Sequence, residues 1–170
     1  PVGAPRLAVQ AESENLDKGG MSFHALPVFS TYARKSYWID IYNQGTGELN
    51  WSVAPSDDWI LISQKSGKTS TENRIHISVN WDKVPVGEKV KGQIDITSGN
   101  QKESVLVSVF NPESPARDEL QGLYVEENGY ISIPAADFHR KFESNDIQMN
   151  ILAGLGFEGR SLQLGNPTAP

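Results

Sequence analysis

Cysteine is absent from this chain of 170 residues. That absence excludes disulfide bonds and thiolate metal sites, and it fits either a cytoplasmic protein or a bacterial exported protein that relies on packing alone. Long apolar runs are also missing, since no stretch approaches the ~20 residues of a membrane-spanning helix. The mean hydropathy is -0.42, and we expect no membrane span.

Positive charge is scarce as well. The chain has 15 Lys and Arg residues against 21 Asp and Glu residues, which gives a formal net charge of -6. The basic residues form no cluster, whereas binding to phosphates requires clustered Lys and Arg side chains. The composition therefore argues against a nucleic-acid partner.

The chain also lacks an initiator methionine, and it has no basic leader followed by an apolar stretch. It begins at Pro1 instead. These features predict a fragment or a processed product.

The sequence has no arrangement of residues typical of an active site. His24, His76 and His139 lie far apart, and none belongs to a recognisable serine motif. Asp57 and Asp58 are adjacent on a predicted turn, so they cannot face each other across a glycosidic bond as the carboxylates of glycosidases do. We predict no catalytic residue, no metal ligand and no cofactor.

Residues 154–159 spell GxGxxG, the glycine pattern of dinucleotide-binding sites. That fingerprint requires a preceding strand and a following helix within a βαβ unit. The surrounding pattern is all β, so we do not assign nucleotide binding to these glycines.

The clearest pattern in the chain is the alternation of apolar and polar residues that starts at Tyr37. In residues 37–42 the odd positions are apolar and the even positions include Trp38 and Tyr42. This period of two is expected of a half-buried strand. Trp38 and Tyr42 should therefore share the outward face of that strand.

Residues 44–47 supply a glycine turn at which we expect the chain to reverse. The return run, residues 49–53, alternates again and directs Trp51 to the interior. A third short apolar run at residues 59–62 is too short and too β-branched to prefer a helix. These three runs predict the first half of a β-sandwich.

Further strands are predicted on both sides of these runs, with residues 13–20 and 64–73 as polar loops between them. The additional strands are expected at residues 7–11, 23–29, 74–81, 92–96 and 105–109. With no credible helix, the pattern predicts an all-β fold that begins with an immunoglobulin-like β-sandwich over residues 1–111.

Residues 112–119 are rich in proline and charge and form the predicted linker. A hairpin is expected at residues 122–133, since its Asn-Gly pair favours a type I′ turn. An irregular loop or a brief helical turn should follow, and then two short apolar runs. Because about fifty residues cannot close a sandwich alone, we predict that residues 120–170 are the start of a truncated second β-rich module, or that this piece leans on the first domain.

Aromatic residues are the remaining candidates for a binding site. Trp51, Trp59 and Trp81 lie on inward faces and are predicted to belong to the core. Trp38 and Tyr42 are two residues apart on one strand, hence about 7 Å apart, and could stack on sugar rings. We take Trp38 and Tyr42 as a candidate carbohydrate-binding site, with packing beneath a loop or against a neighbouring domain as the open alternative.

Four segments in this order carry a family resemblance: LPVFSTYARKSYWIDIYNQGTGELNWSVAPSDDWILIS, RIHISVNWDKVPVGEKVKGQIDI, VEENGYISIPAADF and ILAGLGFEGRSLQLGNPTAP. Together they resemble the C-terminal region of glycoside hydrolase family 115, the bacterial xylan α-1,2-glucuronidases. The first part also resembles the BACON modules that accompany polysaccharide-degrading enzymes of Bacteroidetes, mainly in the pattern around Trp59.

The resemblance implies an upstream catalytic barrel and a second module similar to a carbohydrate-module sandwich. Such modules typically open with a motif similar to I-E-A-E-H-F, and this chain has I-P-A-A-D-F at residues 133–138. Both glutamates are replaced, so we expect no calcium site there. The family tends to place a tryptophan shortly before the run at residues 152–156, and this chain has Met149 there. The difference argues against sugar stacking at that position.

The resemblance further implies a non-catalytic accessory region of a secreted glycoside hydrolase. This region would support the catalytic part or its oligomer, including a homodimer, on xylan or another plant polysaccharide. A periplasmic or extracellular bacterial location follows from the same resemblance. Two alternatives stay open: an independent carbohydrate-binding module, and a cell-surface adhesion or spacer domain.

Overall fold

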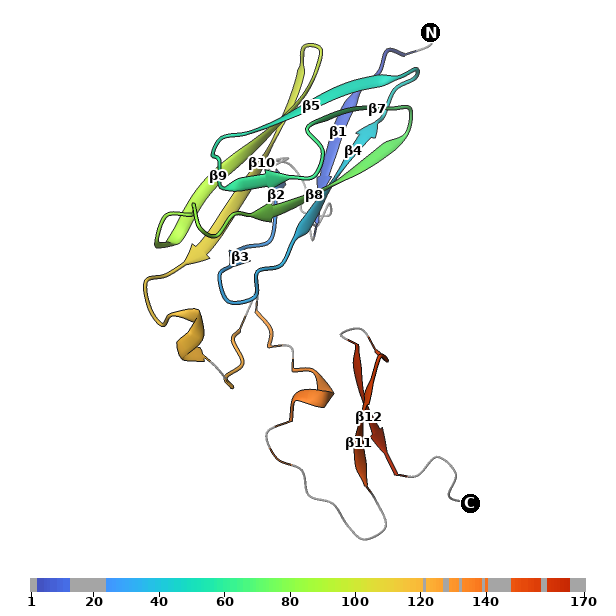
Figure 1. Ribbon diagram of the computed structural model, residues 1–170. Coiled ribbons are helices and arrows are strands. Elements are labelled where there is room, and N and C mark those ends of the chain that lie inside the picture. Colours follow the sequence, from blue (N-terminus) through green and yellow to red (C-terminus); the bar gives the residue numbers. More distant parts are fainter. Residues whose placement is uncertain are drawn as a thin grey trace. The chain divides into compact units, whose positions relative to one another are not determined.

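The computed structural model describes residues 3–12, 24–120, 122–126, 129–131, 133–138, 140, 148–156 and 159–165. The chain divides into two compact units, Pro1–Leu123 and Tyr124–Pro170 (Figure 1). The predicted linker therefore falls within the first unit, whereas the predicted domain boundaries remain a prediction.

The first unit is built from two β-sheets. The four-stranded sheet has the order β1 (Leu7–Ala11), β4 (Tyr37–Asn43), β8 (Glu72–Val79), β6 (Ile60–Ile62). The six-stranded sheet has the order β2 (His24–Ala25), β10 (Gln101–Asn111), β9 (Gly87–Ser98), β5 (Leu49–Pro55), β7 (Ser66–Thr69), with β3 (Phe29–Ser30) also beside β10. The predicted all-β, immunoglobulin-like β-sandwich is confirmed.

The core lies between the two sheets and consists of the inward residues of the alternating strands. Ile39 and Ile41 of β4, together with Ile75 and Ile77 of β8, are fully buried. Trp51 and Trp59 are each only 3% exposed, which confirms their predicted place in the core. Trp81 follows the end of β8 and is partly buried against the same core.

The turn at residues 44–47 does not join two paired strands. β4 and β5 belong to different sheets, so the chain crosses from one layer of the sandwich to the other. Gly47 has a φ of 84°, and a Cβ on Gly45 would lie 2.0 Å from the carbonyl oxygen of Ala4. Alternation showed which faces are buried, but it does not distinguish strands that pair from strands that face each other across a core.

Residues 64–73 are not a loop throughout, because residues 66–69 form β7, which pairs with β5 at the edge of its sheet. The register places Gly67 opposite Trp51, and a Cβ on Gly67 would lie 2.5 Å from Cζ2 of that ring. An edge strand can be polar on most of its surface, so it lacks the apolar alternation that marks a half-buried strand. That is why the sequence pattern predicted a loop here.

The strand predicted at residues 23–29 is split into β2 and β3, which both run parallel to β10. His24, Leu26 and Phe29 are buried, whereas Pro27 is only half-buried. The single predicted strand is thus broken at Pro27, where the alternation of buried residues changes phase. Phe23 and the loop predicted at residues 13–20 lie outside the described residues.

The second unit contains one two-stranded sheet, made of β11 (Met149–Ala153) and β12 (Arg160–Leu164). The 3-10 helix η2 (Ala135–Asp137) confirms the brief helical turn, and a second one, η1 (Arg117–Leu120), belongs to the first unit. No helix in the described part of the chain is long and apolar enough to cross a membrane.

The hairpin expected at residues 122–133 is wrong for the part of it that the structure describes. Those residues form a single isolated bridge at Tyr130 and no strand. Leu123, Ile131 and Ile133 are 63%, 54% and 55% exposed. A lone hairpin is marginally stable in water without a third strand or a packed face, so a favourable turn sequence does not suffice.

Candidate functional site

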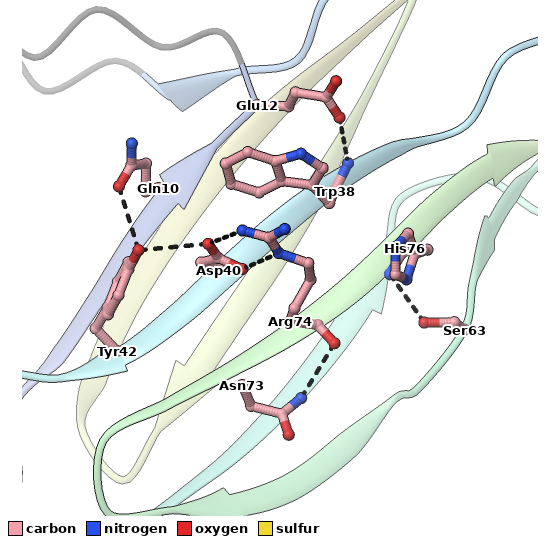
Figure 2. Close-up of polar contacts among 9 residues, drawn as sticks. All are labelled: Gln10, Glu12, Trp38, Asp40, Tyr42, Ser63, Asn73, Arg74 and His76. Carbon is pink, nitrogen blue, oxygen red and sulfur yellow. Dashed lines mark hydrogen bonds and ion pairs between the residues drawn. The ribbon is translucent and has the colours of Figure 1, made fainter. Parts of the chain in front are cut away.

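The outer face of the four-stranded sheet carries the candidate site (Figure 2). Its side chains form three cross-strand rows, because β4 pairs with β1 on one side and with β8 on the other. From β1 through β4 to β8, the rows are Glu12, Trp38 and His76; Gln10, Asp40 and Arg74; and Ala8, Tyr42 and Glu72.

A bidentate ion pair lies at the centre of this face. Arg74 donates from Nε to Oδ1 of Asp40 and from Nη2 to Oδ2, both at 2.7 Å. Asp40 is 5% exposed although it points to the outer face, whereas the side chain of Arg74 is 51% exposed. The fork fixes the plane of the guanidinium group, as is typical of arginine–carboxylate pairs.

The same guanidinium group lies over the indole ring of Trp38. Its central carbon is 3.9 Å from the ring centroid, well within the range of a cation–π contact. Figure 2 shows Arg74 and Asp40 between the rings of Trp38 and Tyr42. The two aromatic residues therefore do not form one continuous stacking platform.

Tyr42 completes the network at the other end. Its hydroxyl group has one hydrogen to donate, and two acceptors share it: Oε1 of Gln10 at 3.3 Å and Oδ2 of Asp40 at 3.4 Å. Burial raises the pKa of Tyr42 above its usual 10.0, and the negative charges of Asp40 and Glu72 raise it further. The hydrogen bond to Asp40 is the main reason that the pKa of Arg74 is raised as well.

The structure thus places both predicted site residues on one outer face, each half-buried. Their role in carbohydrate binding stays a prediction. Sequence reasoning missed Arg74 and Asp40 as site residues, although both fall on the outward side of alternating strands. The signal that joins them is the cross-strand register, and alternation within one strand does not contain it.

The other candidates considered in the sequence do not come together. Asp58 pairs with Lys83 at 2.7 Å, and Asp57 accepts a hydrogen bond from Ser56. His76 is exposed and His24 is buried beside Glu103, while His139 lies outside the described residues. Among the described residues, no group of three or more His, Cys, Asp or Glu side chains could hold a metal ion.

The GxGxxG pattern lies in the connection between β11 and β12. Gly154, Gly156 and Gly159 all have positive φ angles, of 80°, 82° and 72°. The pattern is therefore a strand–turn–strand arrangement, and the helix that a dinucleotide-binding fingerprint needs does not follow it. These glycines serve the turn of a hairpin.

In the second unit, Asp137 of the I-P-A-A-D-F segment is engaged with protein partners. Its Oδ1 lies 2.5 Å from Nη2 of Arg160, and its backbone oxygen accepts a hydrogen bond from the hydroxyl group of Tyr124. A calcium site takes six to eight oxygen ligands, so a single carboxylate that is already paired with an arginine does not indicate one.

Comparison with protein families gives a match at residues 29–110 to the family described as the viral BACON domain. The first unit is BACON-like. The match begins at β3 and ends in β10, so the BACON-like domain contains β4 and β8 and with them Trp38, Asp40, Tyr42 and Arg74. No curated protein matches the chain.

Solved structures similar to this chain are remote. The periplasmic chaperone SfaE is 8% identical at a TM-score of 0.47, covering 70% of this chain and 64% of its own. A Bacteroides ovatus GH5 xyloglucanase in complex with a XXXG heptasaccharide is 18% identical at 0.40, covering 66% of this chain and 21% of its own. The surface layer protein SbsC, domains 1-6, is 15% identical at 0.43, covering 96% of this chain and 22% of its own. The chain thus spans less than two thirds of each of these structures.

Proposed function

We propose that this chain is a non-catalytic accessory region of a secreted carbohydrate-active enzyme. The observation that carries the proposal is the BACON-like match, which covers most of the first sandwich. The chemistry of the candidate site agrees with a binding role, because Arg74, Asp40 and Tyr42 are engaged with one another. A fixed network of this kind suits a contact surface better than a reaction centre, which needs a nucleophile or a poised acid–base pair.

The resemblance to family 115 refines this proposal. Under it, the parent enzyme is a xylan α-glucuronidase of the periplasm or the cell exterior, and the partner of this chain is the catalytic domain upstream. Trp, Tyr and Arg side chains together are typical of the centres of protein interfaces. The outer face of the four-stranded sheet is accordingly the surface through which the chain would support its catalytic partner or a homodimer.

Removal of this region from the parent enzyme tests the proposal. We expect the shortened enzyme to lose solubility or activity on polymeric xylan. Activity on a short glucuronidated oligosaccharide is the control, because it reports the catalytic domain alone. A shortened enzyme that stays soluble and keeps full activity on the polymer would rule out an accessory role.

A second candidate function is carbohydrate binding by the chain itself, through the sheet face that carries Trp38 and Tyr42. The specific observation in its favour is that both rings share one sheet face with fixed polar groups (Figure 2). Affinity electrophoresis in gels that contain plant polysaccharides is the test. If none of these polymers retards the migration of the chain, the chain does not bind carbohydrate.

A further inference from the structure

Arg74 presents hydrogen-bond donors that the ion pair does not use. The fork to Asp40 engages Nε and Nη2, and Nη1 accordingly has no hydrogen-bond partner among the described residues. The side chain is 51% exposed, so a ligand on the outer face can reach it. Because Asp40 and Trp38 hold the guanidinium group in place, little conformational entropy remains to be lost on binding.

Trp38 is less suited to direct stacking than its position in the sequence suggested. The guanidinium group of Arg74, 3.9 Å from the ring centroid, covers one face of the indole. A sugar ring could stack on that face only after displacing an arginine that Asp40 also holds. The contact instead makes Trp38 a support for Arg74.

We propose that Arg74 is the ligand-contacting residue of a binding site for neutral polysaccharide, and that Trp38 and Asp40 are its positioning residues. The proposal rests on the second candidate function, carbohydrate binding by this face. A planar guanidinium group with free donors matches two vicinal hydroxyl oxygens of a sugar ring.

The neighbours of Arg74 complement hydroxyl groups, which both donate and accept hydrogen bonds. Tyr42 offers a hydroxyl group, and Gln10 offers an amide. Glu72, at one end of the third row, offers a carboxylate acceptor. Glu12 offers its carboxylate in part, since its Oε2 already accepts a hydrogen bond from the backbone N–H of Trp38. The face thus combines donors and acceptors over three strands, as recognition of a flat polyhydroxylated chain requires.

The charges on this face favour a neutral ligand over an acidic one. Arg74 is paired with Asp40. Glu12 and Glu72 add two further carboxylates to the three rows, so acidic side chains outnumber Arg74 there. Arg6, the residue before β1, lies past the third row and therefore belongs to none of the three rows. The whole chain carries a formal charge of -6, so a polyanion is repelled at long range as well.

Affinity electrophoresis of the full chain in gels containing neutral arabinoxylan or neutral xyloglucan tests the role of Arg74. Arg74→Lys keeps the charge but loses the planar fork, and we expect it to weaken binding about tenfold. Arg34→Lys is the matched control, since Arg34 also lies over a tryptophan, 5.7 Å from the ring centroid of Trp81. Thermal unfolding of each variant separates lost binding from lost folding. Glu72→Gln removes one negative charge and leaves the fork intact, so it should strengthen binding to an acidic polymer.

A double-mutant cycle separates positioning from direct contact. If Trp38 acts through Arg74, then Trp38→Ala should add little to the loss already caused by Arg74→Lys. Additive losses would mean that Trp38 contacts the sugar directly and would overturn its assignment as a positioning residue. Unchanged binding by Arg74→Lys would overturn the assignment of Arg74.

The ligand class is tested by comparing neutral polymers with glucuronoxylan and polygalacturonate at low salt. Retardation by the neutral polymers alone supports the proposal, and stronger retardation by the acidic polymers overturns it. If no polymer retards the chain, both the proposal and the second candidate function fail. The accessory role is judged separately, from the activity of the shortened parent enzyme.

Discussion

The two units of this chain both form β-strands but differ greatly in burial. In the first unit, residues such as Ile39 and Val107 are fully buried between two sheets. Among the described residues of the second unit, Ala136 is the one buried hydrophobic side chain, while Ile151 and Leu164 are 47% and 65% exposed. Alternation therefore creates a core only where a second layer covers the apolar face.

The largest expected effect comes from a core aromatic of the first unit. Trp59→Ala should destabilise the chain by ~3 to 5 kcal/mol, as for other buried aromatics, because Trp59 is 3% exposed. Leu155→Ala in the second unit, where the side chain is 55% exposed, should change stability by less than ~0.5 kcal/mol. Denaturant titration measures both, and similar effects would show that the contrast between the units is wrong.

A smaller effect is expected at Gly67, whose lack of a side chain leaves room for the ring of Trp51. Gly67→Ala should destabilise by ~1 to 3 kcal/mol, because the new Cβ would press on a buried ring. The atom concerned is Cζ2 of Trp51, at 2.5 Å. Gly3→Ala is the control, since nothing lies within 4 Å of its Cβ position. A neutral Gly67→Ala variant would mean that β7 moves away from β5 at little cost.

We expect Asp95, on the outer face of the six-stranded sheet, to make the stability of the first unit depend on pH. The pKa of Asp95 is lowered from 3.8, first by a hydrogen bond from Ser104 and then by one from Lys102. A depressed folded-state pKa contributes stability above the unfolded value, and this stability is lost as the pH falls through the folded value. Asp95→Asn should therefore lower stability at pH 7 and flatten the decline below about pH 4.

Thermal unfolding of this variant between pH 2 and pH 7 gives the measurement. If the variant loses stability at low pH as steeply as the unchanged chain, Asp95 does not contribute to the pH dependence.

The smallest effect is expected from calcium. Since Asp137 is paired with Arg160, added calcium should not raise the melting temperature of the chain. Magnesium at the same concentration controls for ionic strength. A rise specific to calcium would reveal a calcium site in the chain and would contradict this prediction.

Sequence patterns predicted most of the first unit because its strands are covered on one face only. The positions of β4, β8 and β9 follow from the alternation of apolar residues, and Trp51 and Trp59 lie where that alternation places them. The pairing of strands did not follow, since the connection at residues 44–47 joins two sheets. The edge strand β7 was missed because its residues, Ser66–Thr69, are polar and show no apolar alternation, unlike those of the edge strand β1.

The candidate site was predictable in part. Trp38 and Tyr42 share a face because they are two residues apart, which is a local property. Arg74 reaches Trp38 and Asp40 from a strand more than thirty positions later in the chain, as the separation of 34 between Arg74 and Asp40 shows. Only the register of β4 with β8 brings these side chains together, so the central ion pair could not be read from either strand alone.

The open edges of the first unit are short. β6 has three residues and β7 has four, while β1 has five and β2 and β3 have two each. Lys68 adds a charge to β7, where it pairs with Glu48. Each of these outermost strands therefore offers an incoming strand only a short row of backbone groups. Short outermost strands reduce the tendency of neighbouring copies to aggregate by strand pairing.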